Sequence, residues 1–114
     1  MVQHSRDLSE YRAMWLYAMF DLPVDTKRAR KEYTRFRKGL ISQGFLMLQF
    51  SVYARYCISQ EASAAYRNRI RDLLPPDGQV RLLSVTDRQF GKQEVYNGKR
   101  RKEPEPQPQQ LLLF

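Results

Sequence analysis

The sequence predicts an α+β fold in which two helices cover one face of an antiparallel sheet. Three observations support this prediction. Apolar runs of strand length alternate with two stretches of helical apolar spacing, their order is β-α-β-β-α-β, and turn residues separate them. The length of 114 residues allows one such domain, and a hydrophobic content of 42% is typical of a globular chain rather than a disordered one.

The first strand is expected at residues 15–20, where aromatic and aliphatic residues follow one another without a polar break. A run that is so short and so apolar is typical of a central strand, because both of its faces are covered. Pro23 ends the run, since proline cannot donate to a sheet ladder. The polar residues 1–13 are expected to form an arm before the domain.

Two helices are expected, the first capped by Asp25 or Thr26 and ended by Gly44, the second capped by Ser59. Apolar residues recur in the first at intervals of three and four: Ala29, Tyr33, Phe36 and Leu40. The second has the same pattern: Ala62, Tyr66, Ile70 and Leu73. Each helix therefore has one apolar face to bury.

Residues 45–58 are rich in β-forming residues, but their alternation slips at residues 50–52. This pattern predicts two strands, or one strongly bent strand with a bulge. The Pro-Pro-Asp-Gly turn at residues 75–78 precedes another strand at residues 80–86, and a short fifth strand is expected at residues 93–96. Two helices on one face of a sheet in this order form the ferredoxin-like arrangement.

The folded domain is expected to span residues 14–96, and residues 97–114 are expected to be a tail. Four like charges at residues 99–102 precede alternating prolines at residues 104–108, which predict an extended and solvated segment. The tail ends in the apolar residues 111–114. An apolar tip on a stiff polar tether is either a docking peptide for another protein or a disordered end.

The composition predicts a polyanionic partner, with nucleic acid before an anionic membrane. The chain has 20 Lys and Arg residues against 12 Asp and Glu residues, a net charge of +8. A merely soluble basic protein would have the same balance. Cys57 and His4 are the only residues of their types, which excludes an intrachain disulfide and a cysteine zinc cluster and argues against a histidine base.

The cytoplasm is the expected location, with no membrane partner. No apolar run approaches the roughly 18 residues that cross a bilayer. The N-terminal residues also lack the pattern of a signal peptide.

Asp21 is a candidate metal ligand because it directly follows the predicted central strand. A carboxylate at a strand end can coordinate a hard divalent cation such as Mg²⁺, which prefers oxygen ligands. One carboxylate supplies too few ligands to hold a metal ion firmly. A two-fold dimer could bring two copies of Asp21 together across its axis. An aspartate that opens a turn is more often an Asx-turn or a cap, and this alternative stays open.

The first helix also carries candidate nucleic-acid contacts. Basic residues three or four positions apart form a stripe beside the apolar one: Arg28, Lys31, Arg35 and Lys38. Such a row could follow a phosphate backbone without reading bases. A solvated helix face is the alternative, but such a face normally mixes signs, and here only Asp25 and Glu32 oppose the row.

Several motifs, in this order and spacing over residues 14–96, resemble the CRISPR-associated protein 2 family, the small subunit of the spacer-acquisition machinery. They are FDLP at residues 20–23, GF at 44–45, QFSVY at 49–53, LPPDG at 74–78, LSVT at 83–86 and QF at 89–90. The last three look like the branch that accompanies type II systems. The arm before Met14 and the tail after Gly98 are additions to the family pattern.

The resemblance implies a ferredoxin-like homodimer in which the short strand near residues 93–96 pairs with the partner subunit's sheet. It also implies a metal-dependent nuclease, with Mg²⁺ or Mn²⁺ bound by Asp21 at the dimer interface and Ser51 as a second catalytic residue. Arg35 or Arg37 would lie against nucleic acid.

The resemblance further implies an architectural role, in which the dimer bridges two dimers of the CRISPR integrase and holds a double-stranded DNA prespacer on its basic surface. The tail is an expected contact of the integrase. Three hypotheses of function follow. They are a DNA-binding scaffold in the integration complex, a Mg²⁺-dependent nuclease acting on RNA or duplex DNA, and a toxin-like ribonuclease.

Overall fold

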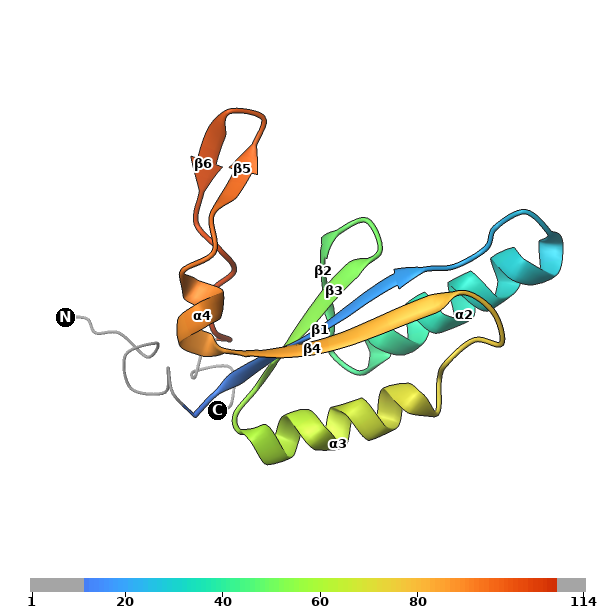
Figure 1. Cartoon of the computed structure of the whole chain (residues 1–114), viewed down its shortest axis with the longest axis horizontal. Helices are drawn as coiled ribbons and strands as arrows, with labels where there is room; N and C mark the ends of the chain where they lie inside the picture. Colours follow the sequence, from blue (N-terminus) through green and yellow to red (C-terminus); the bar gives the residue numbers. More distant parts are fainter. Residues whose placement is uncertain (1–11, 109–114) are drawn as a thin grey trace.

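The computed structural model describes residues 12–108, and its elements follow the predicted order (Figure 1). The main domain consists of β1 (Met14–Asp21), α2 (Lys27–Ser42), β2 (Leu46–Gln49), β3 (Val52–Cys57), α3 (Gln60–Arg71) and β4 (Gln79–Thr86). A short helix α4 (Asp87–Gly91) and a hairpin of β5 (Val95–Asn97) and β6 (Arg100–Lys102) follow it. The expected α+β fold with its βαββαβ order is confirmed.

Four strands form one antiparallel sheet in the order β2-β3-β1-β4. β1 pairs with β3 on one side and with β4 on the other, so it is a central strand, as its unbroken apolar run predicts. Helices α2 and α3 cover one face of this sheet, and the β5–β6 hairpin projects away from it (Figure 1). Within residues 12–108, no helix is both long and apolar enough to cross a membrane.

The larger core lies between the sheet and its two helices. Alternate residues of β1 point into it, because neighbouring side chains of a strand face opposite sides: Met14, Leu16, Ala18 and Phe20. α2 contributes Phe36 and Leu40 from its apolar stripe, and α3 contributes Ile70. These three side chains have no exposed surface. The helical stripes predicted from apolar spacing are therefore the faces that pack.

A smaller core lies on the opposite face of the sheet, around Trp15 of β1. The ring of Phe90 from α4 stacks on Trp15, with 3.9 Å between ring centres. Trp15 Nε1 donates to Asp87 Oδ1 at 2.8 Å, and Gln107 Nε2 donates to Asp87 Oδ2 at 2.7 Å. Asp87 has no exposed surface, so these hydrogen bonds serve a fully buried carboxylate.

The β-rich run between the helices forms two strands. The β2–β3 register shifts between Met47 and Gln49, and Ser51 in the connecting turn has a φ of 62°. The irregularity lies where the sequence alternation slips. A positive φ is uncommon for a residue other than glycine, and it lets the chain reverse within two residues.

The structure differs from the sequence prediction after β4. Helix α4 was not expected, although Thr86 and Gln89 form a capping box at its start. Residues 100–102 were expected in the extended tail, but they form β6 and pair with β5 across Gly98, whose φ is 63°. Gln107 was expected in a solvated linker and is buried, because prolines exclude regular structure without preventing an extended chain from packing.

The boundaries predicted for the arm, the domain and the tail stay predictions. Most of the arm and the apolar tip at residues 111–114 lie outside the described residues.

Candidate nucleic-acid and metal site

Asp21 is the last residue of β1, and its side chain is exposed. It lies opposite Gln79 of β4 in the sheet register. Gly78, with a φ of +92°, packs against this turn so closely that a Cβ there would lie 2.8 Å from the carbonyl oxygen of Asp21 and 2.7 Å from Leu22 Cδ2. The Pro-Pro-Asp-Gly turn thus holds the backbone beneath Asp21 while the carboxylate stays in solvent.

Ser51 lies beside the same end of β1. The backbone N–H of Phe20 donates to the carbonyl oxygen of Ser51 at 3.0 Å, which attaches the β2–β3 turn to the residue before Asp21. The Ser51 hydroxyl lies 3.5 Å from that of Tyr33 on α2. The structure therefore brings the two predicted catalytic residues to one end of the sheet.

The donors present at this end fit only a loosely held metal ion. Among residues 12–108 there is no group of three or more His, Cys, Asp or Glu side chains that could hold one. Mg²⁺ commonly keeps several waters and uses one or two carboxylates together with substrate phosphates. Asp21 of one protomer can supply one of those carboxylates, and a closed cage would need ligands from elsewhere.

The basic residues of α2 gather on its exposed side, around a shallow depression of about 450 Å³. It is lined by Lys27, Arg30, Lys31, Thr34, Arg35 and Lys38. Three of the predicted contacts, Lys31, Arg35 and Lys38, are brought together there. Sequence reasoning missed Lys27 and Arg30, although Lys27, Lys31 and Lys38 share a helical stripe and could have been found by their spacing.

The two remaining predicted contacts lie elsewhere. Arg28 lines a separate pocket of about 390 Å³ between the start of α2 and residues 75–77. Arg37 is partly buried and does not line the depression. The expected row is therefore shifted by about one residue around the helix.

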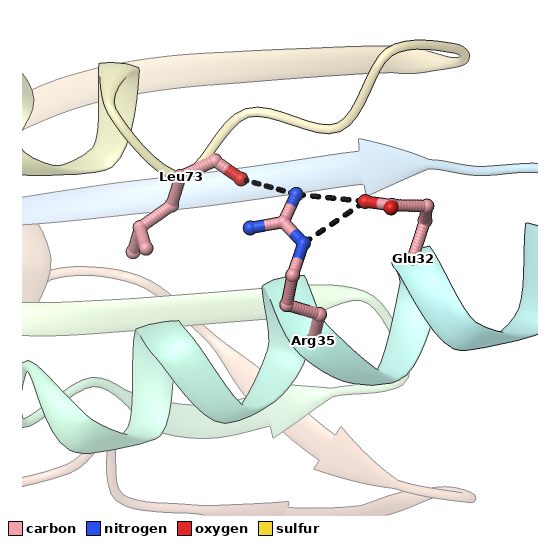
Figure 2. A network of polar contacts seen from close by, with 3 residues as sticks. All are labelled: Glu32, Arg35 and Leu73. Atoms are coloured by element: carbon pink, nitrogen blue, oxygen red, sulfur yellow. Dashed lines mark hydrogen bonds and ion pairs between the residues drawn. The ribbon is translucent and has the colours of Figure 1, made fainter.

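Arg35 differs from its basic neighbours because its guanidinium is bonded on two sides (Figure 2). Its Nε donates to Glu32 Oε1 at 2.9 Å, and its Nη2 donates to the carbonyl oxygen of Leu73 at 3.0 Å. Leu73 follows α3, so this side chain joins the two helices. Arg35 thus has a structural role within the basic surface.

Comparison with known proteins finds one family over most of the chain. The model of the family described as CRISPR associated protein Cas2 matches residues 14–93. The chain belongs to the Cas2 family. This confirms the resemblance drawn from the motifs.

Several relatives support the assignment to the Cas2 family, each named CRISPR-associated endoribonuclease Cas2. That of Parvibaculum lavamentivorans is 50% identical over 101 residues, covering 89% of this chain and 100% of the relative. That of Flavobacterium psychrophilum is 42% identical over 112 residues, covering 98% and 97%. That of Ligilactobacillus salivarius is 39% identical over 101 residues, covering 89% and 100%.

The Cas2 match includes Asp21, Ser51 and all of α2, and it ends before β5. The β5–β6 hairpin and the packed segment that carries Gln107 lie beyond this match, but the Flavobacterium psychrophilum relative covers 98% of this chain and so extends over them. All residues predicted for metal and nucleic acid therefore lie in the part shared with the family.

The sheet face opposite α2 and α3 is apolar and only partly covered in this Cas2 chain. Leu83 of β4 lies opposite Tyr17 on that face, and Leu46 of β2 lies opposite Ala54. Leu83 is 50% exposed and Leu46 is 51% exposed. Burial, opposed in part by a hydrogen bond to Gln93, raises the pKa of Tyr17, which keeps its hydroxyl neutral at this face.

Proposed function

We propose that this Cas2 family protein acts in CRISPR spacer acquisition as a homodimer that holds duplex prespacer DNA and bridges integrase dimers. The observation that carries the proposal is the basic surface on one side of α2, whose depression is lined by five cationic residues. Only Glu32 is found paired with one of them in the described part of the chain. Such a surface suits phosphates, which lysine and arginine side chains contact whatever the base sequence is.

The dimensions of the row suit a duplex. From Lys27 to Lys38 the helix rises about 16 Å, at 1.5 Å per residue. Duplex DNA carries one charge per roughly 1.7 Å of its axis, so a row of this length can face the phosphates of about five base pairs. A backbone contact of this kind fits a scaffold that must accept prespacers of any sequence.

The proposed homodimer is supported by the partly covered sheet face. Half-exposed leucines on β2 and β4 leave apolar surface that a second copy would remove from water. The hairpin strand β5 pairs with β6 within the chain, and in the described structure its other edge carries no strand. That edge is available for the expected pairing with the partner subunit's sheet.

The second candidate function is a metal-dependent nuclease. It is favoured by the placement of Asp21 and Ser51 at one end of the sheet and by the name endoribonuclease that the relatives carry. A bound Mg²⁺ or Mn²⁺ would supply charge neutralisation at a phosphodiester and a more acidic water. Asp21 would hold the ion, together with its copy from the other protomer. A toxin-like ribonuclease is a variant of this candidate.

An integration assay with the cognate integrase, a prespacer duplex and an array plasmid tests the first function. Replacing both Lys31 and Lys38 by alanine should lower integration at least tenfold, because two phosphate contacts are removed. The matched control removes two exposed cations elsewhere, Arg71 and Lys92, and should stay near wild type. Equal loss in both double variants would contradict the α2 surface as the DNA site.

Asp21→Ala separates the two candidates in the same assay. Integration that survives this substitution supports the scaffold. If the variant still forms a folded dimer but no longer integrates, the result supports metal-dependent catalysis. Purified protein should then be tested on RNA and duplex DNA with Mg²⁺ or Mn²⁺, and cleavage that Asp21→Ala leaves unchanged would contradict the nuclease. Growth arrest on expression, relieved by Asp21→Ala, would favour the toxin-like variant.

A further inference from the structure

Two arginines from different elements meet at one aromatic ring beside the C-terminal end of α2. The guanidinium carbon of Arg55, on β3, lies 4.1 Å from the ring centre of Tyr66, and that of Arg69, on α3, lies 4.7 Å from it. Arg55 Nη2 donates to the Tyr66 hydroxyl, and Arg69 Nη1 donates to Gln43 Oε1 at 3.3 Å. Two positive charges are thereby held close together despite their repulsion.

Gly44 provides the space for the Arg55 guanidinium. Its φ is +85°, and a Cβ at this position would lie 2.5 Å from Arg55 Nη1. The turn that ends α2 is thus shaped around the side chain, whose Cα is fixed in the interior strand β3. The guanidinium is pre-positioned rather than free to rotate in solvent.

The protein leaves most of this positive charge unbalanced. The C-terminal end of a helix carries a partial charge of about −0.5, and the last turn of α2 has no basic residue of its own. Arg69 lies in the last turn of α3, whose end carries a similar partial charge, and the two guanidiniums still exceed the sum of about −1. Neither Arg55 nor Arg69 forms an ion pair with a carboxylate in the part of the chain that the structure describes.

The hydrogen-bond donors are also in excess. Each guanidinium has five N–H donors, and each of these two makes one hydrogen bond to a side chain in the described structure. Arg55 Nε is buried and has no hydrogen-bond partner. This atom is closed to an outside acceptor, so the donors that a ligand can reach are chiefly those of Arg69, which is exposed, whereas Arg55 is half-buried.

We propose that Arg55 and Arg69, organised by Tyr66, form a phosphate-binding site for the nucleic-acid backbone, distinct from the basic row of α2. Guanidinium forks match phosphate oxygens in geometry and charge, which suits them to this ligand. Gln43, which Arg69 contacts, lies about 8 Å along the helix axis beyond Lys38. Five residues also turn by about 140° around the helix, so a backbone on the α2 row reaches this pair by crossing the end of α2 toward α3, and the inference rests on the proposed nucleic-acid binding.

Fluorescence anisotropy of a labelled duplex, measured over a series of salt concentrations, tests the site. Arg69→Gln should weaken binding about tenfold and reduce the slope of log K against log salt by about 1. Arg71→Gln is the matched control, since Arg71 is also exposed in the last turn of α3 but bonds only to its neighbour Asn68 among described residues. Arg71→Gln should change the slope of log K against log salt by less than half as much as Arg69→Gln does.

NMR signals of the arginine Nε–H groups give a second readout on the wild-type protein. Inorganic phosphate, added at constant ionic strength, should shift the Nε–H signals of Arg55 and Arg69 while leaving that of Arg71 in place. If these signals shift but the duplex does not bind, the site takes free phosphate and the proposed function fails. If the duplex binds through Lys31 and Lys38 while Arg69→Gln matches its control and no signal moves, the inference alone is overturned.

Discussion

At the level of single residues, basic side chains that are neighbours on α2 differ in their contacts and therefore in their roles. Lys31 and Lys38 border the exposed depression, whereas Arg35 joins α2 to the chain after α3 through Glu32 and Leu73. The hydrogen bond to a backbone carbonyl contributes about 1 kcal/mol, more than an exposed ion pair usually does. Arg35 is thus expected to matter for stability before it matters for binding.

Arg35→Ala should lower the free energy of unfolding by about 1 kcal/mol and the Tm by about 5 °C. Lys38→Ala removes the same charge without those bonds and should leave the Tm nearly unchanged. Thermal unfolding followed by circular dichroism measures both. Equal Tm values for the two variants would show that the Arg35 bridge does not stabilise the fold.

Alanine substitutions at Gly78 and Gly98 distinguish the stability cost of backbone strain from that of steric crowding. Both have a positive φ, but a Cβ at Gly78 would meet the carbonyl of Asp21, whereas a Cβ at Gly98 would meet nothing within 4 Å. Gly98→Ala should cost about 1 kcal/mol for its conformation alone. Gly78→Ala should cost about 1–3 kcal/mol more, because the turn under Asp21 must move. Urea unfolding of the two variants measures the difference, and similar midpoints would contradict the close packing.

At the level of elements, the predictable parts are those whose apolar spacing extends over several turns or residues. β1, α2 and α3 have such patterns, and the structure confirms all three. Helix α4 has one turn and a half, too short for a periodic signal, and β6 is fixed by pairing with β5 rather than by its own charged residues. Local pattern cannot report a contact that is made only in the folded chain.

The candidate site was predictable to a similar degree. Helical spacing gave Lys31 and Lys38, and the strand end gave Asp21. The proximity of Ser51 to Asp21 depends on a backbone hydrogen bond between β1 and the β2–β3 turn, which no spacing contains. The Arg55–Tyr66–Arg69 contacts likewise join a strand to a helix and are visible only in three dimensions.

Asp87 of helix α4 is hydrogen-bonded to Gln107 in the segment beyond β6. We therefore expect a substitution of Gln107 to lower the stability of the fold. Gln107→Ala removes a hydrogen-bond donor from a buried carboxylate and should lower stability by about 1–2 kcal/mol. Trp15 is the only tryptophan and bonds to the same carboxylate, so its fluorescence should shift to the red. Glu103→Ala, at an exposed position of the same segment, is the control and should change neither quantity.

At the level of the whole molecule, the two faces of the sheet are divided between two tasks in the proposed function. The helices cover one face of the sheet (Figure 1). They present the basic surface, while the other face keeps half-exposed leucines. Because the sheet lies between these surfaces, a substitution on one is expected to leave the other intact. Oligomeric state and DNA affinity can then be varied separately.

Leu83→Arg should weaken the proposed dimer by placing a charge in its apolar interface. Ile41→Arg adds the same charge at a similarly exposed apolar position on α2, and it should leave the dimer unchanged. Sedimentation equilibrium measures the dimer dissociation constant, for which at least a tenfold rise is expected in the first variant. A monomeric wild type, or equal constants for both variants, would contradict the use of this sheet face.

The contacts of Asp87 also bear on the connectivity of the chain. Its backbone N–H donates to the carbonyl oxygen of Ala13 at 2.9 Å, and its carboxylate accepts from Gln107. The first and last parts of the described chain thus meet at one residue, a geometry that tolerates circular permutation. A gene that joins residue 114 to residue 1, and opens new ends in the turn at Gly98, should yield the same sheet.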